Sequence, residues 1–338
     1  MRCAFTIVEL LVVLAIIGLV AAVMIPAVQQ GREASRRAQC ASHLQELGRA
    51  LHNYESAFRA FPPAMPAMPN NPIIGNAWYA PHVRLLPYVE QGAAFGNVNL
   101  SQPVLPAISK YSGPVPANVS PNDPRLAVVP VFKCPSDAAL AALNPAANYR
   151  VSAGSRPYDW HRGPFVILQP RTSGQFRDGL SATVGMSEKL VGAANPATFS
   201  RRRDFWYSGS AALQSNPSAD EMITICASLV APPSDFYSFS GSSWFYAGYE
   251  FTWYNHVVPP NAQTPDCAVD LADLPDGVSA GPVSGGLFQA TSYHSAGVNC
   301  LMMDGACRFI SDDVDISVWR AFATVASGEA LAGAPGDI

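Results

Sequence analysis

A stretch without a single charge, residues 10–28, constrains this chain more than any other feature. As a helix rising about 1.5 Å per residue it would be about 28 Å long, close to the ~30 Å hydrocarbon layer of a bilayer. One carboxylate, Glu9, stands where the stretch begins. A charge at that depth is costly and is therefore a functional candidate. The sequence predicts a membrane-spanning half-helix over residues 5–28 with Glu9 at its entrance.

The helix is expected to continue as an amphipathic half over residues 29–61, with a kink at Pro26 because proline removes one backbone donor. Large apolar residues in this half recur at spacings of 3, 4, 3, 4 and 3, which place them on one helical face. We expect one helix of roughly 80 Å from residue 5 to about 60. Its second half should pack on a sheet through this stripe: Leu44, Leu47, Leu51, Tyr54, Phe58 and Phe61.

Composition divides the remainder of the chain. Prolines make residues 62–72 an extended connection. A globular head follows over 73–330, in which 193–285 is the least regular part and is predicted to be a variable insertion; 331–338 is a short tail. The chain has 30 prolines and 25 glycines in 338 residues, so the head should have long loops. The formal net charge of −4 argues against nucleic acid as a partner, which requires a basic face.

Within the head, apolar runs between turn residues predict strands at 128–134, 163–169, 183–191 and 286–291. Asp315 is placed to cap a final helix. Long helix first and strands later indicate an α+β fold, with the second half of the helix lying on an antiparallel sheet.

Asp304-Gly305, between two apolar runs, is the strongest hairpin signal in the chain. A two-residue type I′ turn would set Met302 opposite Cys307 and give both turn residues a positive φ. Four side chains would then share one face of the hairpin: Cys300, Met302, Cys307 and Phe309.

The chain contains seven cysteines, of which Cys3 lies before residue 5. The other six form an even set, which permits disulfides in an exported domain, and no spacing among them matches a metal site. In the predicted hairpin Cys300 and Cys307 are diagonal, so a bridge between them is possible, but buried thiols are favoured.

Seven aromatic residues are concentrated within residues 244–254. Aromatic side chains at this density can stack on sugar rings, but they more often form the core of a sheet. We therefore expect core residues here and keep carbohydrate binding as an alternative.

The start of the chain resembles the type IV prepilin processing site, with a short basic leader, Phe5, and Glu9 four residues later. The resemblance implies that a prepilin peptidase removes residues 1–4 by cutting between Ala4 and Phe5, and that the new amino group is methylated. The family usually has Gly before the cut, where this chain has Ala4.

A secretory signal peptide cut near Ala21-Ala22, or a plain membrane anchor, would also explain the apolar run. Neither explains an acid at Glu9. The positive-inside rule gives a conflicting indication, because three arginines follow the span and only Arg2 precedes it, which would place the head in the cytoplasm. The exported character of the head outweighs this rule here. The three arginines are Arg32, Arg36 and Arg37.

The whole chain is similar to the DUF1559 family of prepilin-like exported proteins. Four segments carry the resemblance: the prepilin start, residues 44–63, the set formed by 85–91, 134–137 and 178–188, and His294 followed after nine residues by Asp304-Gly305. The last is the H-X9-DG element found in such proteins. In the third set, residues 180–183 (Leu-Ser-Ala-Thr) depart from the family's usual polar run.

His294 and Asp304 invite a metal or catalytic interpretation, but one His and one Asp do not make a metal site. Turn chemistry alone explains Asp304. The sequence also lacks the serine-hydrolase elbow, the His-Glu-x-x-His motif and a phosphate loop. We therefore expect no enzyme activity, no metal and no cofactor.

The resemblance implies a pilin-like fold and a structural subunit of a type II secretion or type IV pilus-like fibre. Its partners would be the prepilin peptidase, other pilin-like subunits, an inner-membrane assembly platform and membrane lipid. The chain would cross the inner membrane once, with its head exported, and Glu9 would serve assembly. The alternative is a membrane-tethered module that binds a solute or carbohydrate.

Overall fold

The structure is a computed structural model. It describes residues 7–65, 79–100, 107–109, 113–115, 123–137, 145–157, 162–167, 169–207, 217–229, 236–269 and 285–326. The leader at 1–4, Phe5 and the tail at 331–338 lie outside the described residues.

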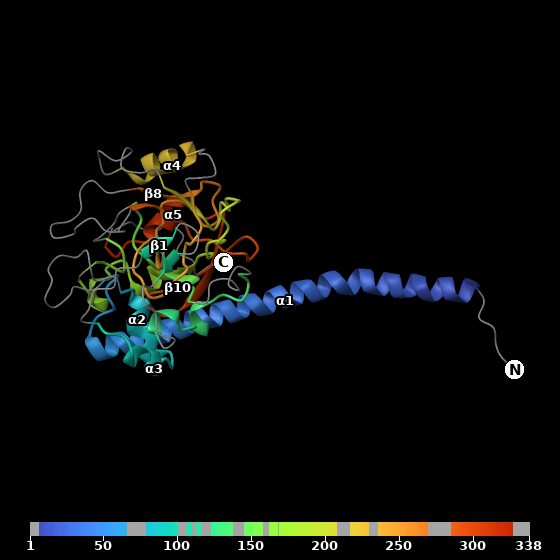
Figure 1. Cartoon of the computed structure of the whole chain (residues 1–338), viewed down its shortest axis with the longest axis horizontal. Coiled ribbons are helices and arrows are strands. Elements are labelled where there is room, and N and C mark those ends of the chain that lie inside the picture. Colours follow the sequence, from blue (N-terminus) through green and yellow to red (C-terminus); the bar gives the residue numbers. More distant parts are fainter. Residues whose placement is uncertain are drawn as a thin grey trace.

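A single helix, α1 (Ile7–Phe58), forms the stem and runs out from the head for most of its length (Figure 1). Its 52 residues correspond to about 78 Å at the standard rise, as expected from the sequence. Pro26 lies inside the helix and does not end it. The long helix with a head at one end confirms the predicted α+β, pilin-like architecture.

The second half of α1 packs on the head through one face, and the predicted stripe is correct along most of its length. Leu44, Leu47, Leu51 and Tyr54 are all at most 6% exposed. The prediction is wrong at Phe58, because the helix ends at this residue and its side chain is 61% exposed. Phe61 is buried as predicted, but it lies beyond the end of the helix.

The main sheet has five strands in the order β11-β10-β4-β3-β7. Its neighbouring strands are antiparallel except for β7, which runs parallel to β3 and corrects the expectation of a purely antiparallel sheet. The strands are β3 (Tyr149–Ser152), β4 (Val184–Glu188), β7 (Trp253–Tyr254), β10 (Gly297–Met302) and β11 (Cys307–Ser311).

Alternate side chains of β10 enter two different cores. Leu301 joins the core that contains the α1 stripe. Val298, Cys300 and Met302 join a second core with Trp319 of α5 (Ile316–Ala321). The sheet therefore lies between α1 and α5. The predicted cap of α5 is confirmed: the Asp315 carboxylate accepts from the backbone N–H of Ser317 at 2.8 Å.

A second sheet, in the order β6-β5-β8-β9, lies with α4 in the 193–285 region and just beyond it. A disulfide between Cys226 of α4 and Cys267 of β8 joins helix and sheet. Because β7 also belongs to this region, the predicted insertion contributes a strand to the main sheet. The elements are β5 (Phe205–Tyr207), α4 (Ala219–Ser228), β6 (Phe236–Tyr237), β8 (Asp266–Val269) and β9 (Gly285–Leu287).

Short elements complete the head: α2 (Pro81–Leu85), α3 (Gly92–Gly96) and the two-stranded ribbon of β1 (Ala107–Ser109) and β2 (Gly113–Val115). Two strand predictions are wrong. A 3-10 turn, Pro130–Phe132, replaces the strand at 128–134, as its proline at the first position favours.

In the described part of the strand predicted at 163–169, only a bridge between Ile167 and Met65 is present. The described start of the predicted extended connection, residues 62–65, is buried beside it. The backbone N–H of Ala64 donates to the carbonyl of Val166 at 2.8 Å. The connection therefore begins as part of the core.

The hairpin of β10 and β11 is present, but its register differs by one residue from the prediction. Leu301 faces Cys307, and the loop contains three residues between Met302 and Ala306. Within this loop only Gly305 has a positive φ, and its value is 90°. A three-residue loop with a left-handed glycine replaces the predicted type I′ turn.

The one-residue shift moves Cys307 to the opposite face of the sheet from Cys300, since side chains alternate along a strand. Both thiols are free, and Cys300 is buried as favoured from the sequence, whereas Cys307 is only partly buried. The aromatic residues of 244–254 are buried, which confirms their prediction as core residues.

Candidate functional site: the joint between stem and head

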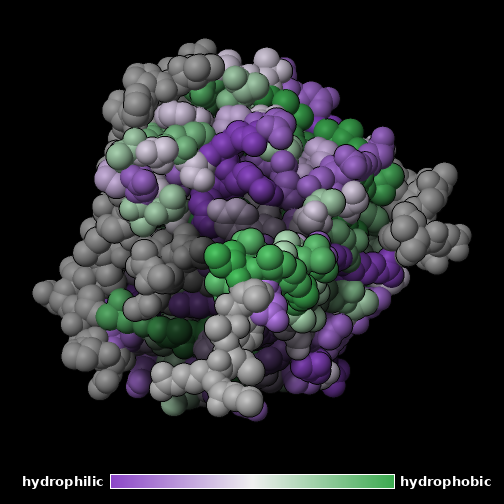
Figure 2. Space-filling model, turned by 90° about the vertical axis from the view of Figure 1, so that its right-hand side faces the viewer, coloured by the Kyte–Doolittle hydropathy of each residue, from purple (hydrophilic) through white to green (hydrophobic). Residues whose placement is uncertain are grey.

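Two features of the stem are candidates for function: its exposed apolar end and its joint with the head. Side chains of residues 7–28 are exposed almost throughout, although nearly all are apolar. Viewed along the stem from its N-terminal end, they form a hydrophobic patch in front of a head that shows many hydrophilic residues (Figure 2). Glu9 lies in the first turn of α1, while Ala4 and Phe5 lie outside the described residues.

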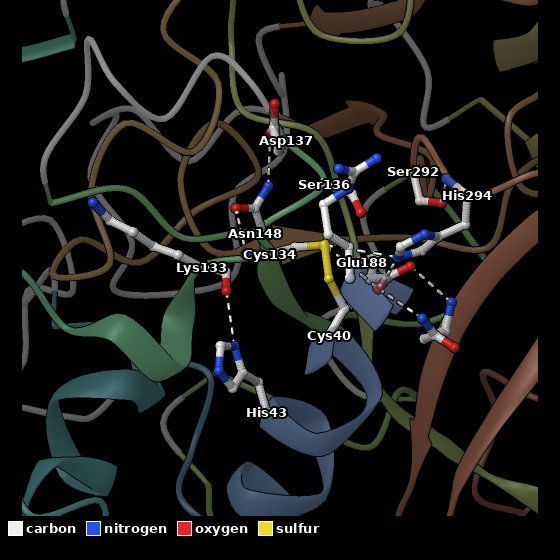
Figure 3. The surroundings of a disulfide bond; sticks show 12 residues. Cys40, His43, Lys133, Cys134, Ser136, Asp137, Asn148, Glu188, Ser292 and His294 are labelled. Carbon is white, nitrogen blue, oxygen red and sulfur yellow. Dashed lines mark hydrogen bonds and ion pairs between the residues drawn. A yellow bond between two sulfur atoms is a disulfide. The ribbon is translucent and has the colours of Figure 1, made fainter. Parts of the chain in front are cut away.

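A disulfide between Cys40 of α1 and Cys134 fastens the stem to the head (Figure 3). The segment that carries Cys134 is held on both sides. The backbone N–H of Cys134 donates to Asn148 Oδ1 at 3.0 Å, and His43 Nδ1 lies 2.9 Å from the carbonyl oxygen of Lys133. Because His43 also belongs to α1, this segment is fixed to the stem at two places.

His294 lies beside this disulfide, between two carboxylates from different parts of the chain. Its Nδ1 is 2.8 Å from Oε1 of Glu33 on α1, and its Nε2 is 3.2 Å from Oε1 of Glu188 at the end of β4. Nε2 also lies 3.7 Å from Cys134 Sγ. An imidazolium can donate to both carboxylates at once. This arrangement therefore joins stem and head by charge as well as by a covalent bond.

The protonation of His294 follows from these neighbours. Burial alone would lower the pKa of His294, but the hydrogen bonds and charges of Glu188 and Glu33 outweigh burial and raise it. Burial likewise acts to raise the pKa of Glu33, and the hydrogen bonds from His294, Arg36 and Ser136 lower it overall. Both shifts favour the charged pair across the joint.

Glu188 is buried and held by Asn299 of β10. Its Oε2 accepts from the backbone N–H of Asn299 at 2.9 Å, and its Oε1 accepts from the side-chain amide at 2.9 Å. We name the five residues that meet here the joint cluster: Glu33, Cys40, Cys134, Glu188 and His294.

The H-X9-DG element does not form one site, because His294 and Asp304-Gly305 lie beyond opposite ends of β10. Asp304 Oδ1 accepts from the backbone N–H of Ala306 at 2.9 Å, which is turn chemistry as predicted. Each end of the element nevertheless contacts α1. His294 is hydrogen-bonded to Glu33 of α1. Gly305 lies so close to Gly48 of α1 that a Cβ atom added to Gly48 would be 3.2 Å from Gly305 Cα.

The distance between the two ends of the H-X9-DG element thus matches the distance between their two contacts on α1. Glu33 and Gly48 are fifteen residues apart, or about 22 Å along a helix. The six residues of β10 cover about 20 Å. A strand of this length places a charged contact at one end of the packed half of α1 and a close backbone contact near the other.

Sequence reasoning missed the roles of Glu33, Glu188 and the Cys40–Cys134 bridge. The signal available was the resemblance, because three of its segments (134–137, 178–188 and His294) converge on this cluster. No spacing rule could reveal it, since its members come from four distant segments.

The family described as "Protein of unknown function (DUF1559)" matches this chain over residues 29–317. The chain belongs to the DUF1559 family. The match includes the whole joint cluster and begins after the apolar half of the stem. No curated protein and no solved structure matches the chain.

Proposed function

We propose that this DUF1559 protein is a non-enzymatic structural subunit, a pseudopilin or pilin-like protein, of a type II secretion or type IV pilus-like fibre. The observation that carries the proposal is the exposed apolar half of α1, continuous with a half that is fixed to the head.

An isolated helix that is apolar on all sides must be covered by lipid or by other helices. Before assembly, inner-membrane lipid would cover residues 7–28. In a fibre, equivalent helices of neighbouring subunits would cover them. The firm joint supports this use, because a stem that packs with other stems must place its head at a fixed angle.

The prepilin-like start supplies a reason for Glu9. Cleavage by a prepilin peptidase between Ala4 and Phe5 would create an amino terminus about 6 Å along the helix from Glu9. That amine can pair with Glu9 of an axially shifted neighbour, which offsets the cost of both charges in an apolar surrounding and sets the stagger.

Two disulfides support export of the head, since such bonds persist in oxidising compartments. The stem would then span the inner membrane once, with the head outside the cytoplasm. An assembly platform in that membrane would draw subunits into the fibre.

The test is Glu9→Val. We expect membrane insertion and peptidase cleavage, followed by gel shift, to be unchanged, while shear fractionation and cross-linking detect no incorporation into fibres. Glu46→Val, which removes a carboxylate outside the apolar half of the same helix, should assemble normally. A normal fibre yield from Glu9→Val would contradict an assembly role for Glu9.

A second function, a membrane-tethered module for an anionic solute, is favoured by one observation. A hollow of about 750 Å³ in the head is lined by four arginines, with α5 on one side. A tethered receptor requires only an apolar anchor, so it would tolerate Glu9→Val. The four arginines are Arg156, Arg162, Arg171 and Arg320.

A further inference from the structure

The joint cluster holds four potential metal ligands in one place. The sulfur atoms of Cys40 and Cys134, a carboxylate oxygen of Glu188 and a ring nitrogen of His294 all lie within 4.8 Å of one another, and all four residues are buried. Thiolate, imidazole and carboxylate together are the ligand types that Zn²⁺ takes in four-coordinate sites.

Several distances already suit such a site. Around a tetrahedral zinc, ligand atoms are separated by about 3.6 Å for S···N, 3.3 Å for N···O and 3.5 Å for S···O. Here Cys134 Sγ lies 3.7 Å from His294 Nε2 and 4.0 Å from Glu188 Oε1. His294 Nε2 and Glu188 Oε1 are 3.2 Å apart.

The surrounding residues provide the second observation. A histidine that binds zinc through one nitrogen usually donates its other N–H to a carboxylate, which fixes the ring. His294 Nδ1 points to Glu33 in this way, at 2.8 Å. Its Nε2 is left facing Glu188 and Cys134, at 3.2 Å and 3.7 Å (Figure 3). Glu188 is oriented by two hydrogen bonds from Asn299. These outer contacts exist already in the disulfide form.

We propose that reduction of the Cys40–Cys134 disulfide converts the joint cluster into a zinc site with Cys40, Cys134, Glu188 and His294 as ligands. The spacing of the sequence did not predict it, because the four ligands come from four separate segments.

The chemistry balances with a dithiol as reductant. The S–S bond of the protein breaks, the dithiol becomes a disulfide, and its two protons and two electrons leave Cys40 and Cys134 as thiols. Zn²⁺ then displaces the two thiol protons and the proton on His294 Nε2, and binds both thiolates, the ring nitrogen and the Glu188 carboxylate. The sulfurs must separate to about 3.8 Å around the metal. Stem and head therefore have two alternative links, one covalent and one through zinc.

The experiment uses the full chain in detergent micelles, reduced with a water-soluble phosphine and then freed of it without oxygen. Co²⁺ is the probe. The reduced wild type should bind one cobalt per chain, with the thiolate-to-cobalt charge-transfer band and the visible bands of tetrahedral cobalt, and zinc should bleach both. The oxidised wild type should give neither band.

Variants then assign the ligands. Cys134→Ala and His294→Ala should weaken binding at least about hundredfold, and Glu33→Gln, outside the ligand set, about ten- to hundredfold. The matched control is Cys226→Ser with Cys267→Ser, which removes the other disulfide and should bind cobalt normally.

A reduced wild-type chain that binds no cobalt, folded or not by near-ultraviolet circular dichroism, overturns the proposal. So does binding that survives Cys134→Ala or that disappears in the control. The wild-type measurement alone is decisive, so a variant that fails to fold does not leave the question open.

Discussion

The two halves of α1 are equally helical and both rich in apolar residues, yet their surroundings differ completely. Residues 7–28 are apolar on every side and lie outside the head, whereas the packed half carries one apolar stripe with polar residues around it. The difference shows that the width of an apolar face, more than its hydrophobicity, decides whether a helix finds its partner within its own chain. Four predictions test this contrast.

The largest effect should come from a charge in the packed half. Leu47 is fully buried, so Leu47→Asp should lower the free energy of unfolding of the head by about 4 kcal/mol, through the cavity and the buried charge. Thermal or denaturant unfolding of the full chain in micelles measures it.

The matched control lies in the other half. Ile16 is 56% exposed, and Ile16→Asp should change the stability of the head by less than about 0.5 kcal/mol while weakening membrane insertion. Equal destabilisation by the two variants would show that the halves do not differ as described.

The second largest effect should be a loss of stability of the folded head at acidic pH. Burial lowers the pKa of His82 to about 4 and that of His256 to about 3, so both stay neutral in the folded head. In the unfolded chain each titrates near pH 6.5. Between pH 5.5 and 4.5 the unfolded state therefore binds two more protons, and stability falls as pH falls.

Over that one pH unit the free energy of unfolding of the head should fall by about 3 kcal/mol, or about 1.4 kcal/mol for each histidine. Urea unfolding followed by tryptophan fluorescence would measure it. The apolar half of the stem contains no histidine, so its helix content in micelles should not change over the same range. A head whose stability rises toward pH 4.5 would contradict the assignment of neutral buried rings.

A smaller effect is expected at Gly48, where the backbone of α1 packs closely against the loop at Gly305. An added Cβ at Gly48 would lie 2.9 Å from Leu301 Cδ1 and 3.2 Å from Gly305 Cα, so Gly48→Val should cost about 2 kcal/mol. At Gly31, in the same helix, such an atom would have no described neighbour within 4 Å. Gly31→Ala should stabilise the helix slightly, by up to about 1 kcal/mol. Similar losses from both changes would disprove close packing at Gly48.

The smallest effect concerns the turn that touches Gly48. Gly305 has a φ of 90°, which an alanine tolerates poorly, so Gly305→Ala should cost about 1 kcal/mol. Asp304 has no positive φ, so Asp304→Asn should leave the turn intact. Chemical denaturation of the two variants measures the difference, and equal losses would contradict a loop in which Gly305 alone has a positive φ.

The sequence was sufficient for features that depend on local periodicity or caps. It predicted the long helix, the stripe through Tyr54, the Asp315 cap and the hairpin. The hairpin register failed because Asp304-Gly305 is compatible with more than one loop length, and the observed loop packs against Gly48 of α1.

The joint cluster could not be predicted from the sequence, for a different reason. Its contacts join residues 94 to 261 positions apart, and nothing local to Glu33 or Glu188 distinguishes them from other acids on a helix or strand. The strand predicted at 128–134 failed for a related reason, since Pro130 begins a turn that delivers Cys134 to the stem.

The position of the Cys40–Cys134 bridge has a mechanical consequence. Cys40 is among the first buried residues of the packed half of α1, so tension applied along the stem reaches this covalent bond before it reaches Leu44. From Cys134, whose backbone N–H donates to the Asn148 side chain, the load passes to Asn148 and into β3. The bridge thus bypasses the chain between the two cysteines, a separation of 94 residues that includes the whole buried stripe. A pulled subunit would thus keep its helix seated until the sheet itself yields.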